Sequence, residues 1–183
     1  MLLKAGAKPN AEKGVEVRND ATPLFFAVMA GDVQMTEALL AAGAKLGDKM
    51  KILGTIPTSA LNYVTSLGDA KMVTYLIGKG ADPNEVDDDN ISVLDWAAIA
   101  NRTAVVDVLI AKGANVNHVD KYGMTPLLYA ASIDFGNTTV MEKLIAAGAD
   151  VKAKNKEGLT PLELAKSFHH RTLATVLEAK RHP

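Results

Sequence analysis

The sequence predicts an all-α protein built from short helix pairs that repeat along the chain. Three observations support this fold class: the composition, two recurring phrases, and the helix signals inside those phrases. Apolar residues make up 48% of the 183 residues, but aromatic residues only 5%. This balance suits closely packed helices better than a β-sandwich, which favours aromatic and β-branched residues.

Two phrases recur in alternation. The first reads LLKAGAKPN from Leu2, LLAAGAKLG from Leu39, LIGKGADPN from Leu76, LIAKGANVN from Leu109 and LIAAGADVK from Leu144. The second reads TPLFFAV from Thr22, SALNYVT from Ser59, SVLDWAA from Ser92, TPLLYAA from Thr125 and TPLELAK from Thr160. Successive copies follow one another at about 33 residues, which indicates a tandem repeat.

Each copy carries the signals of two helices. Thr or Ser opens the second phrase and predicts the N-cap of a first helix, and Pro follows it where the helix tolerates Pro. The second helix has paired apolar residues on one face, as in Val105, Val106, Leu109 and Ile110. We expect left-handed C-caps at Gly43, Gly80, Gly113 and Gly148. Polar segments such as 120–123 and 155–158 read as tight turns.

This pattern resembles the ankyrin family, whose repeat of about 33 residues carries T-P-L-H-x-A. The resemblance implies an all-α ankyrin-repeat solenoid of stacked helix-turn-helix units with β-turn or hairpin finger loops. We expect a single domain over residues 1–183, in which residues 1–10 are the tail of an incomplete first repeat. Further repeats are expected at about 17–49, 50–86, 87–119, 120–154 and 155–183, the last being a C-terminal cap with Lys166 and Glu178 on a polar outer face.

The chain departs from the family pattern in three ways. The family's histidine in TPLH is replaced in every copy, by Phe25, Asn62, Asp95, Leu128 and Glu163, which leaves the rigidity of the turns open. The first two connections between repeats are longer than the others, and the fourth copy has extra residues near Asp134 and Phe135. Trp96 stands where other copies have Phe, Tyr or Leu, so we expect it to pack in the core.

Composition excludes several classes of function. The net charge of −1 shows no basic excess, which disfavours binding to nucleic acid. The absence of cysteine rules out disulfides and zinc–thiolate sites. No signal peptide or membrane-length apolar run is visible, which predicts no membrane partner and favours a cytoplasmic location. We expect a monomer without cofactors.

No residue pattern predicts catalysis or metal binding. The neighbouring side chains of His169 and His170 diverge on a helix. The acidic run 87–89 lacks the alternating ligands and distal glutamate of a calcium loop, so Asp87 is expected to organise a turn while its neighbours face water. Phosphate-binding and nucleophile motifs are absent. The sequence therefore predicts that this chain is not an enzyme.

The resemblance implies a protein–protein interaction scaffold that binds a protein or peptide on the concave face formed by finger turns and first helices. The register selects as partner-binding residues Ile56, Leu67, Asp88, Asp89, Ile91, Ile99, Lys121, Tyr122, Met124, Ile133 and Lys156. The main contacts are expected from Tyr122, Met124, Ile99 and Ile133. Two alternatives stay open: these side chains only fill turns and inner helix faces, or the chain is an accessory or spacer domain of a larger multidomain protein whose activity lies elsewhere.

Overall fold

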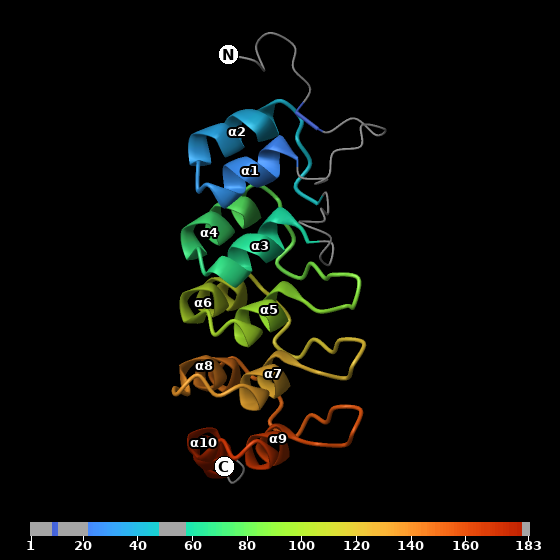
Figure 1. Ribbon diagram of the computed structural model, residues 1–183, viewed down its shortest axis with the longest axis vertical. Coiled ribbons are helices and arrows are strands. Elements are labelled where there is room, and N and C mark those ends of the chain that lie inside the picture. The colour runs from blue at the N-terminus through green and yellow to red at the C-terminus, as the bar shows by residue number, and fades with distance from the viewer. Residues whose placement is uncertain (1–8, 11–21, 48–57, 181–183) are drawn as a thin grey trace. The chain divides into compact units, whose positions relative to one another are not determined.

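The computed structural model describes residues 9–10, 22–47 and 58–180, and this part of the chain contains ten α-helices (Figure 1). Their bounds are α1 Pro23–Met29, α2 Val33–Ala41, α3 Ala60–Leu67, α4 Ala70–Gly78, α5 Val93–Ile99, α6 Thr103–Ala111, α7 Pro126–Ser132, α8 Thr139–Ala146, α9 Pro161–Ser167 and α10 Arg171–Lys180. Among the described residues, an isolated antiparallel β-bridge joins Val86 and Ser92. The all-α prediction is therefore confirmed.

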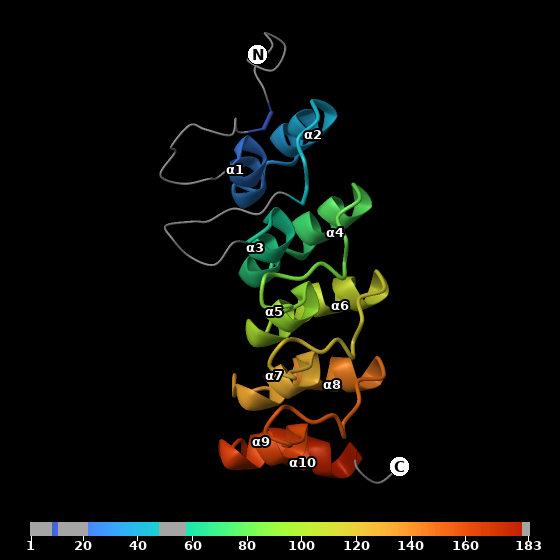
Figure 2. The ribbon, with the colours of Figure 1, turned by 90° about the vertical axis from the view of Figure 1, so that its right-hand side faces the viewer.

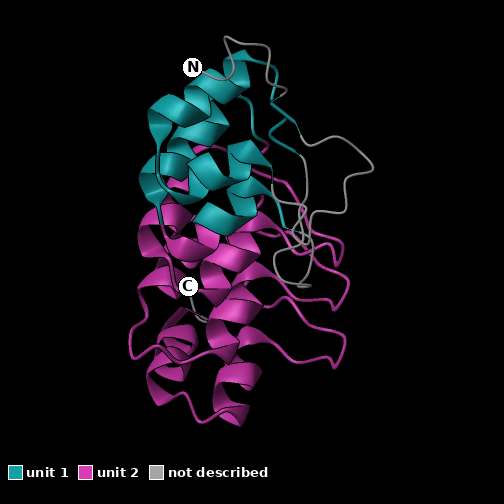
Figure 3. Cartoon of the chain, turned by 45° about the horizontal axis from the view of Figure 1, so that its top comes forward, with its two compact units in different colours: residues 1–64, 69–81 teal, residues 65–68, 82–183 magenta. Residues whose placement is uncertain are grey.

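The chain divides into two compact units, residues 1–64 with 69–81 and residues 65–68 with 82–183 (Figure 3). In the first unit α1 packs on α2, and the rings of Phe25 and Tyr63 lie 4.8 Å apart between centroids. The prediction of one domain over residues 1–183 stays a prediction.

In the second unit the helices form two rows. First helices pack on first helices, α5 on α7 and α7 on α9, while α6 packs on α8. Each first helix also packs on its own second helix, and the fingers of this unit project on the same side (Figures 1 and 2). Fully buried side chains between the rows form the core: Val93, Ala97, Val105, Val106, Leu109, Leu127, Leu128, Ala131, Leu144 and Ala165.

The predicted helix signals work as expected. The five residues predicted as N-caps of the first helices each accept a hydrogen bond from a backbone N–H of the first turn. Examples are Phe25 N to Thr22 Oγ1 at 3.3 Å and Leu128 N to Thr125 Oγ1 at 3.2 Å. The four predicted C-cap glycines all have positive φ. Between α7 and α8 the extra residues lengthen the bend, and Phe135 there is exposed.

Asparagine side chains join neighbouring repeats of the second unit. Asn84 Nδ2 donates to the carbonyl oxygen of Gly113 at 3.3 Å, and Asn84 Oδ1 accepts from Asn115 N at 2.8 Å. Gly113 directly follows Lys112, the C-cap residue of the next repeat's second helix. One side chain thus bonds two backbone groups of the loop that follows the next repeat's second helix.

The next repeat shows the same arrangement. Asn117 Nδ2 donates to Gly148 O at 3.0 Å, and Asn117 Oδ1 accepts from Asp150 N at 2.8 Å. Asn115 Oδ1 in turn accepts from Asn117 N at 3.0 Å, which orients the backbone before the asparagine.

These bonds form a continuous series, which we call the asparagine ladder. It comprises Asp82, Asn84, Asn115, Asn117, Asp150 and Lys152. Lys152 holds the last position through its backbone N–H, which bonds Asp150 Oδ1 at 2.8 Å. The sequence signal for the ladder is the Asn in ADPN and ANVN.

We call each asparagine that bonds the next repeat a rung of the ladder. Removing a rung should destabilise the second unit. For Asn117→Ala we expect a loss of about 1–2 kcal/mol in the free energy of unfolding, because two hydrogen bonds between repeats disappear. Lys152→Ala is the matched control, since it occupies the same register position and its side chain makes no ladder bond. Urea denaturation followed by circular dichroism measures both. Equal losses for the two variants would contradict the role of the ladder.

Candidate interaction surface

The surface that the sequence predicts is built on three fingers of the second unit, residues 82–92, 115–125 and 150–160, here called the first, second and third fingers. One side chain organises the turn of each. Asp87 Oδ1 accepts from the backbone N–H groups of Asp89 and Ile91 at 2.8 and 2.9 Å. Asp120 and Asn155 do the same in the second and third fingers. This confirms the prediction that Asp87 organises its turn, and it shows the turns to be alike.

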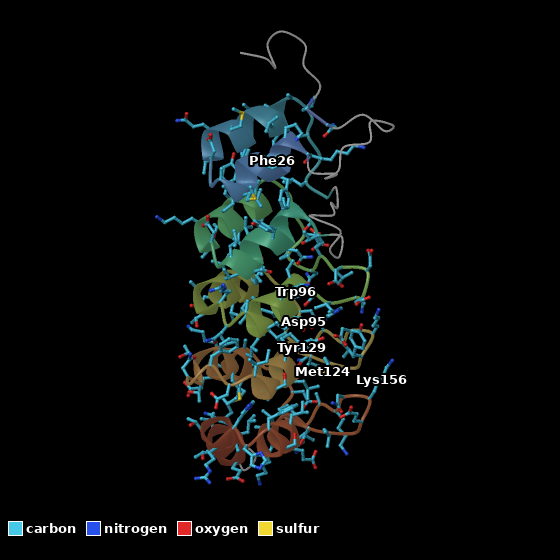
Figure 4. The ribbon with its side chains drawn as sticks, viewed as in Figure 1. Phe26, Asp95, Trp96, Met124, Tyr129 and Lys156 are labelled. Carbon is cyan, nitrogen blue, oxygen red and sulfur yellow. The ribbon has the colours of Figure 1, made fainter. Side chains whose placement is uncertain are left out.

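Aromatic side chains tie two of these turns to the first helices. Trp96 Nε1 of α5 donates to Asp87 Oδ2 at 3.0 Å, and the Tyr129 hydroxyl of α7 donates to Asp120 Oδ2 at 2.5 Å. Burial and the bond to Asp120 raise the pKa of Tyr129 above its ordinary value, so the hydroxyl keeps its proton. Figure 4 shows Trp96 and Tyr129 on their helices beside the finger bases.

This tie bears on two points that the sequence raised. Trp96 is half-buried, and its ring nitrogen donates to the buried Asp87 carboxylate. The rigidity that the family's histidine would supply is provided one position later, by Trp96 and Tyr129. In the last copy Leu164 stands at this position and cannot donate a hydrogen bond, and the turn residue there is Asn155 instead of an aspartate.

The tips of the first and second fingers are joined by charge and hydrogen bonds. Lys121 forms an ion pair with Asp89, and the Tyr122 hydroxyl donates to Asp89 Oδ2 at 3.1 Å. Lys121 Nζ also lies 5.1 Å from the centroid of the Tyr122 ring. The bond from Lys121 holds the pKa of Asp89 below its ordinary value, so the carboxylate stays charged. Asp89 therefore does not simply face water, which corrects the expectation for the acidic run.

The second and third fingers approach each other at a glycine. Gly123 has φ of 77°, and a Cβ atom there would lie 2.9 Å from Lys156 N. Only glycine therefore fits this tip without displacing the neighbouring finger. Lys156 itself is exposed and lies out on the third finger (Figure 4).

A buried carboxyl group lies beneath the first two fingers. Asp95 is 0% exposed and its Oδ2 accepts from Ser92 N and Ser92 Oγ at 2.8 and 2.6 Å. Its Oδ1 has no hydrogen-bond partner among the described residues. His118 Nε2 lies 4.0 Å from Asp95 Oδ2 and bonds the carbonyl oxygen of Asn90 at 2.7 Å. Burial raises the pKa of Asp95 from 3.8 to about 6, against the opposing effects of Ser92 and His118.

Most predicted partner-binding residues are accessible. Leu67, Asp88, Lys121, Tyr122 and Lys156 are exposed, whereas Asp89, Ile99, Met124 and Ile133 are half-buried. Ile91 is only 8% exposed and belongs to the core, so its inclusion was wrong: its side chain offers too little surface to a partner. Ile56 lies outside the described residues.

Other kinds of site find little support in the described residues. No group of three or more His, Asp or Glu side chains there could hold a metal ion, and none of the described helices could cross a membrane. A hollow of about 480 Å³ lies beside α8 and α10, lined by Glu142, Ile145, Ala146, Val176, Ala179 and Lys180. It lacks the converging polar groups of a small-molecule site.

Comparison with known proteins identifies the repeat. A family model for ankyrin repeats in three copies matches residues 60–155 and 94–181, and a model for one ankyrin repeat matches residues 19–51. The chain therefore belongs to the ankyrin repeat family. A search of curated proteins finds no match. Ankyrin repeats are generally protein–protein interaction modules.

The tie between Tyr129 and Asp120 can be tested by removing one hydroxyl group. For Tyr129→Phe we expect a loss of about 1–2 kcal/mol in the free energy of unfolding, because a buried Asp120 oxygen loses its donor. Tyr63→Phe is the control at the same register position. Chemical denaturation of both variants measures the effect, and a loss confined to Tyr63→Phe would contradict the tie.

Asp95 should make stability depend on pH. A raised pKa means that the folded state prefers the protonated carboxyl, so this stabilisation is full below pH about 4 and is lost as pH rises through about 6. Compared with Asp95→Asn, the unmodified chain should lose on the order of 1–3 kcal/mol more between pH 4 and pH 7. Urea titrations at each pH unit measure this difference.

The control for this measurement is Asp88→Asn, which changes an exposed carboxylate on the same finger. Its stability should follow the pH profile of the unmodified chain. Parallel profiles for the unmodified chain and Asp95→Asn would show that Asp95 does not carry the effect.

Proposed function

We propose that the second unit is a scaffold that binds a protein or peptide partner along its fingers and the ends of its first helices. The observation that carries this proposal is a set of accessible apolar side chains at the C-terminal ends of successive first helices. Leu67 ends α3 and is 52% exposed, Ile99 ends α5, and Ile133 directly follows α7. Exposed apolar side chains on successive repeats are typical of an interaction surface.

The fingers extend this apolar set. Tyr122 is 48% exposed at the tip of the second finger, and Met124 is half-buried at the base of the same finger. Tyrosine and methionine are enriched at protein interfaces because they provide contact area of adaptable or amphipathic character. The apolar side chains proposed to contact a partner are therefore Leu67, Ile99, Tyr122, Met124 and Ile133.

Charged side chains of both signs lie around these apolar side chains. Asp88 and Lys156 are exposed on the first and third fingers. Lys121 and Asp89 neutralise each other, so a partner gains little by pairing with either. A polar rim around an apolar centre supports a protein surface as the partner rather than a strongly charged polymer.

Hydrogen bonds within the chain fix the conformation of the first and second fingers without a partner. Asp87 and Asp120 fix their turns, and Trp96 and Tyr129 fix these turns to the helices. A preorganised surface avoids the cost of ordering loops on binding, so a few well-placed side chains can decide the affinity.

Alanine substitutions on this surface should weaken capture of the partner. For Tyr122→Ala and Ile99→Ala we expect a loss of about 1–3 kcal/mol in binding free energy each, because apolar contact area is removed. Affinity capture with quantitative mass spectrometry identifies the binding protein, and titration of that purified protein measures the loss.

The matched control is Ile110→Ala, which truncates a half-buried isoleucine on a second helix instead of a first helix. Its effect on melting should resemble that of Ile99→Ala, but capture should be unchanged. If Ile110→Ala weakens capture as much as Ile99→Ala, the effect follows stability and the proposed surface is wrong.

A further inference from the structure

The charge of the fingers changes sign along the second unit. The first finger carries five acidic side chains and no lysine or arginine. The second finger carries one acid and one base, Asp120 and Lys121, and the third carries three lysines against two acids. All three fingers project on the same side of this unit (Figures 1 and 2). A partner that spans them therefore meets negative charge at one end and positive charge at the other.

The lysines of the third finger are accessible to a partner. Lys152, Lys154 and Lys156 are all exposed, and none of them pairs with an acidic side chain among the described residues. Of the two acids on this finger, Asp150 accepts the backbone N–H of Lys152 at 2.8 Å, and Glu157 is exposed. The third finger thus has a net positive surface with three ammonium groups that can bond carboxylates of a partner.

The first finger keeps an excess of negative charge after its contact with the second finger. Lys121 neutralises Asp89, but Asp82 and Asp88 are exposed and Glu85 is half-buried. An acidic segment of a partner is repelled at this finger. Repulsion of the wrong ligand or the wrong orientation is a common source of specificity at protein interfaces.

The first and third fingers act on different parts of a partner. Helices that pack on one another lie about 8–10 Å apart, so α5 and α9, which both pack on α7, lie about 16–20 Å apart in their row. Exposed charges are screened over about 8 Å at physiological ionic strength. A partner residue over the third finger therefore responds to its lysines and only weakly to the carboxylates of the first finger.

The third finger also borders a hollow of about 280 Å³. Its lining includes Lys152 and Lys154 together with the apolar side chains Leu162 and Leu177. Glu163 lies in the same lining, and its Oε2 accepts from Thr160 N and Thr160 Oγ1, both at 2.7 Å. A hollow with two ammonium groups beside apolar side chains suits a partner segment in which acidic and apolar residues are neighbours.

We propose that the partner contributes a peptide segment with acidic residues over the third finger and apolar residues over Tyr122, Met124 and Ile133. The proposal rests on the proposed function and adds the chemistry and the direction of the partner. The lysines attract the acidic end, and the first finger opposes the reversed orientation. Each exposed ion pair contributes little, so the preference comes from the lysines acting together.

Fluorescence anisotropy with two labelled peptides of about eight residues tests the proposal. An extended chain of that length covers about 26–29 Å, which is enough to span the three fingers. Both peptides share an apolar half of leucine and phenylalanine, and the other half is glutamate in one peptide and lysine in the other. The glutamate peptide should bind the full chain about tenfold more tightly or better. Salt at about 0.5 M should reduce this preference to about threefold or less.

Charge reversal on the third finger should remove the preference. The test variant combines Lys154→Glu with Lys156→Glu. The matched control combines Lys71→Glu with Lys112→Glu, which makes the same change in net charge at two exposed lysines outside the fingers and should leave the preference unchanged. Circular dichroism checks that both variants keep their helices.

The proposal is overturned if the two peptides bind equally, if the lysine peptide binds more tightly, or if neither peptide binds. It is also overturned if the control variant loses the preference as fully as the third-finger variant. A uridine oligonucleotide provides the remaining comparison. If it displaces the labelled glutamate peptide at a lower concentration than the unlabelled peptide does, nucleic acid is the ligand and the proposal is wrong.

Tyr122→Ala separates this proposal from the proposed function. It should weaken the binding of both peptides by a similar factor, because they share the apolar half. Equal affinities for the two peptides that Tyr122→Ala still lowers would contradict the charge preference alone. If Tyr122→Ala changes the binding of neither peptide, the binding surface itself is wrong and this proposal fails with it.

Discussion

The second unit is held in register by the hydrogen bonds that asparagine side chains form between one repeat and the next. A helix pair of this size cannot bury its own apolar face, and the second helix ends with carbonyl groups that have no partner inside the helix. Backbone N–H groups just past the helix satisfy these carbonyl groups, as Gly113 N does for Ile110 O. Asn84 and Asn117 add a bond between repeats, because each bonds the glycine carbonyl that follows the next repeat's second helix and the loop after it. The apolar core drives stacking without direction, while the ladder selects one register for it. Gly47 stands at the ladder position between the first and second described repeats and has no side chain with which to form a rung.

The fingers are likewise held by single side chains that each make several hydrogen bonds. One carboxylate in each of two turns accepts both turn N–H groups and the aromatic donor from the first helix. The finger tips are then spaced by the Lys121–Asp89 pair on one side and by the close approach of Gly123 to Lys156 on the other. Asp95 stands apart from this pattern, because burial leaves one of its oxygens without a partner among the described residues. Three buried acids thus lie at this surface, and Asp87 and Asp120 use both carboxylate oxygens in hydrogen bonds, whereas Asp95 uses one.

Much of the fold could be read from local signals. Thr22, Thr125 and the equivalent residues predicted helix starts correctly, since N-capping involves only the cap residue and the next turn. The candidate surface was harder to predict. Leu67 and Tyr122 proved accessible, but Ile91 is buried, because the hairpin turns its side chain toward the core. Trp96 was misjudged because a ring position predicts burial but not the carboxylate that its N–H group will meet.

By itself the sequence determined the repeat, the helix pairs, the turn residues and the ankyrin family, because these depend on spacing and on contacts within a few residues. The tertiary structure decided which side chains serve as rungs between repeats, which aromatic groups hold the fingers, and which apolar residues stay accessible. The rungs depend on atoms about one repeat apart that come together only when the helix pairs stack. Each aromatic tie joins a helix to a finger residue nine positions earlier, which depends on how the finger folds back on that helix. Phe26 and Met35 illustrate this, because they are 51% and 49% exposed, whereas residues at the same register positions in later copies are half-buried or buried.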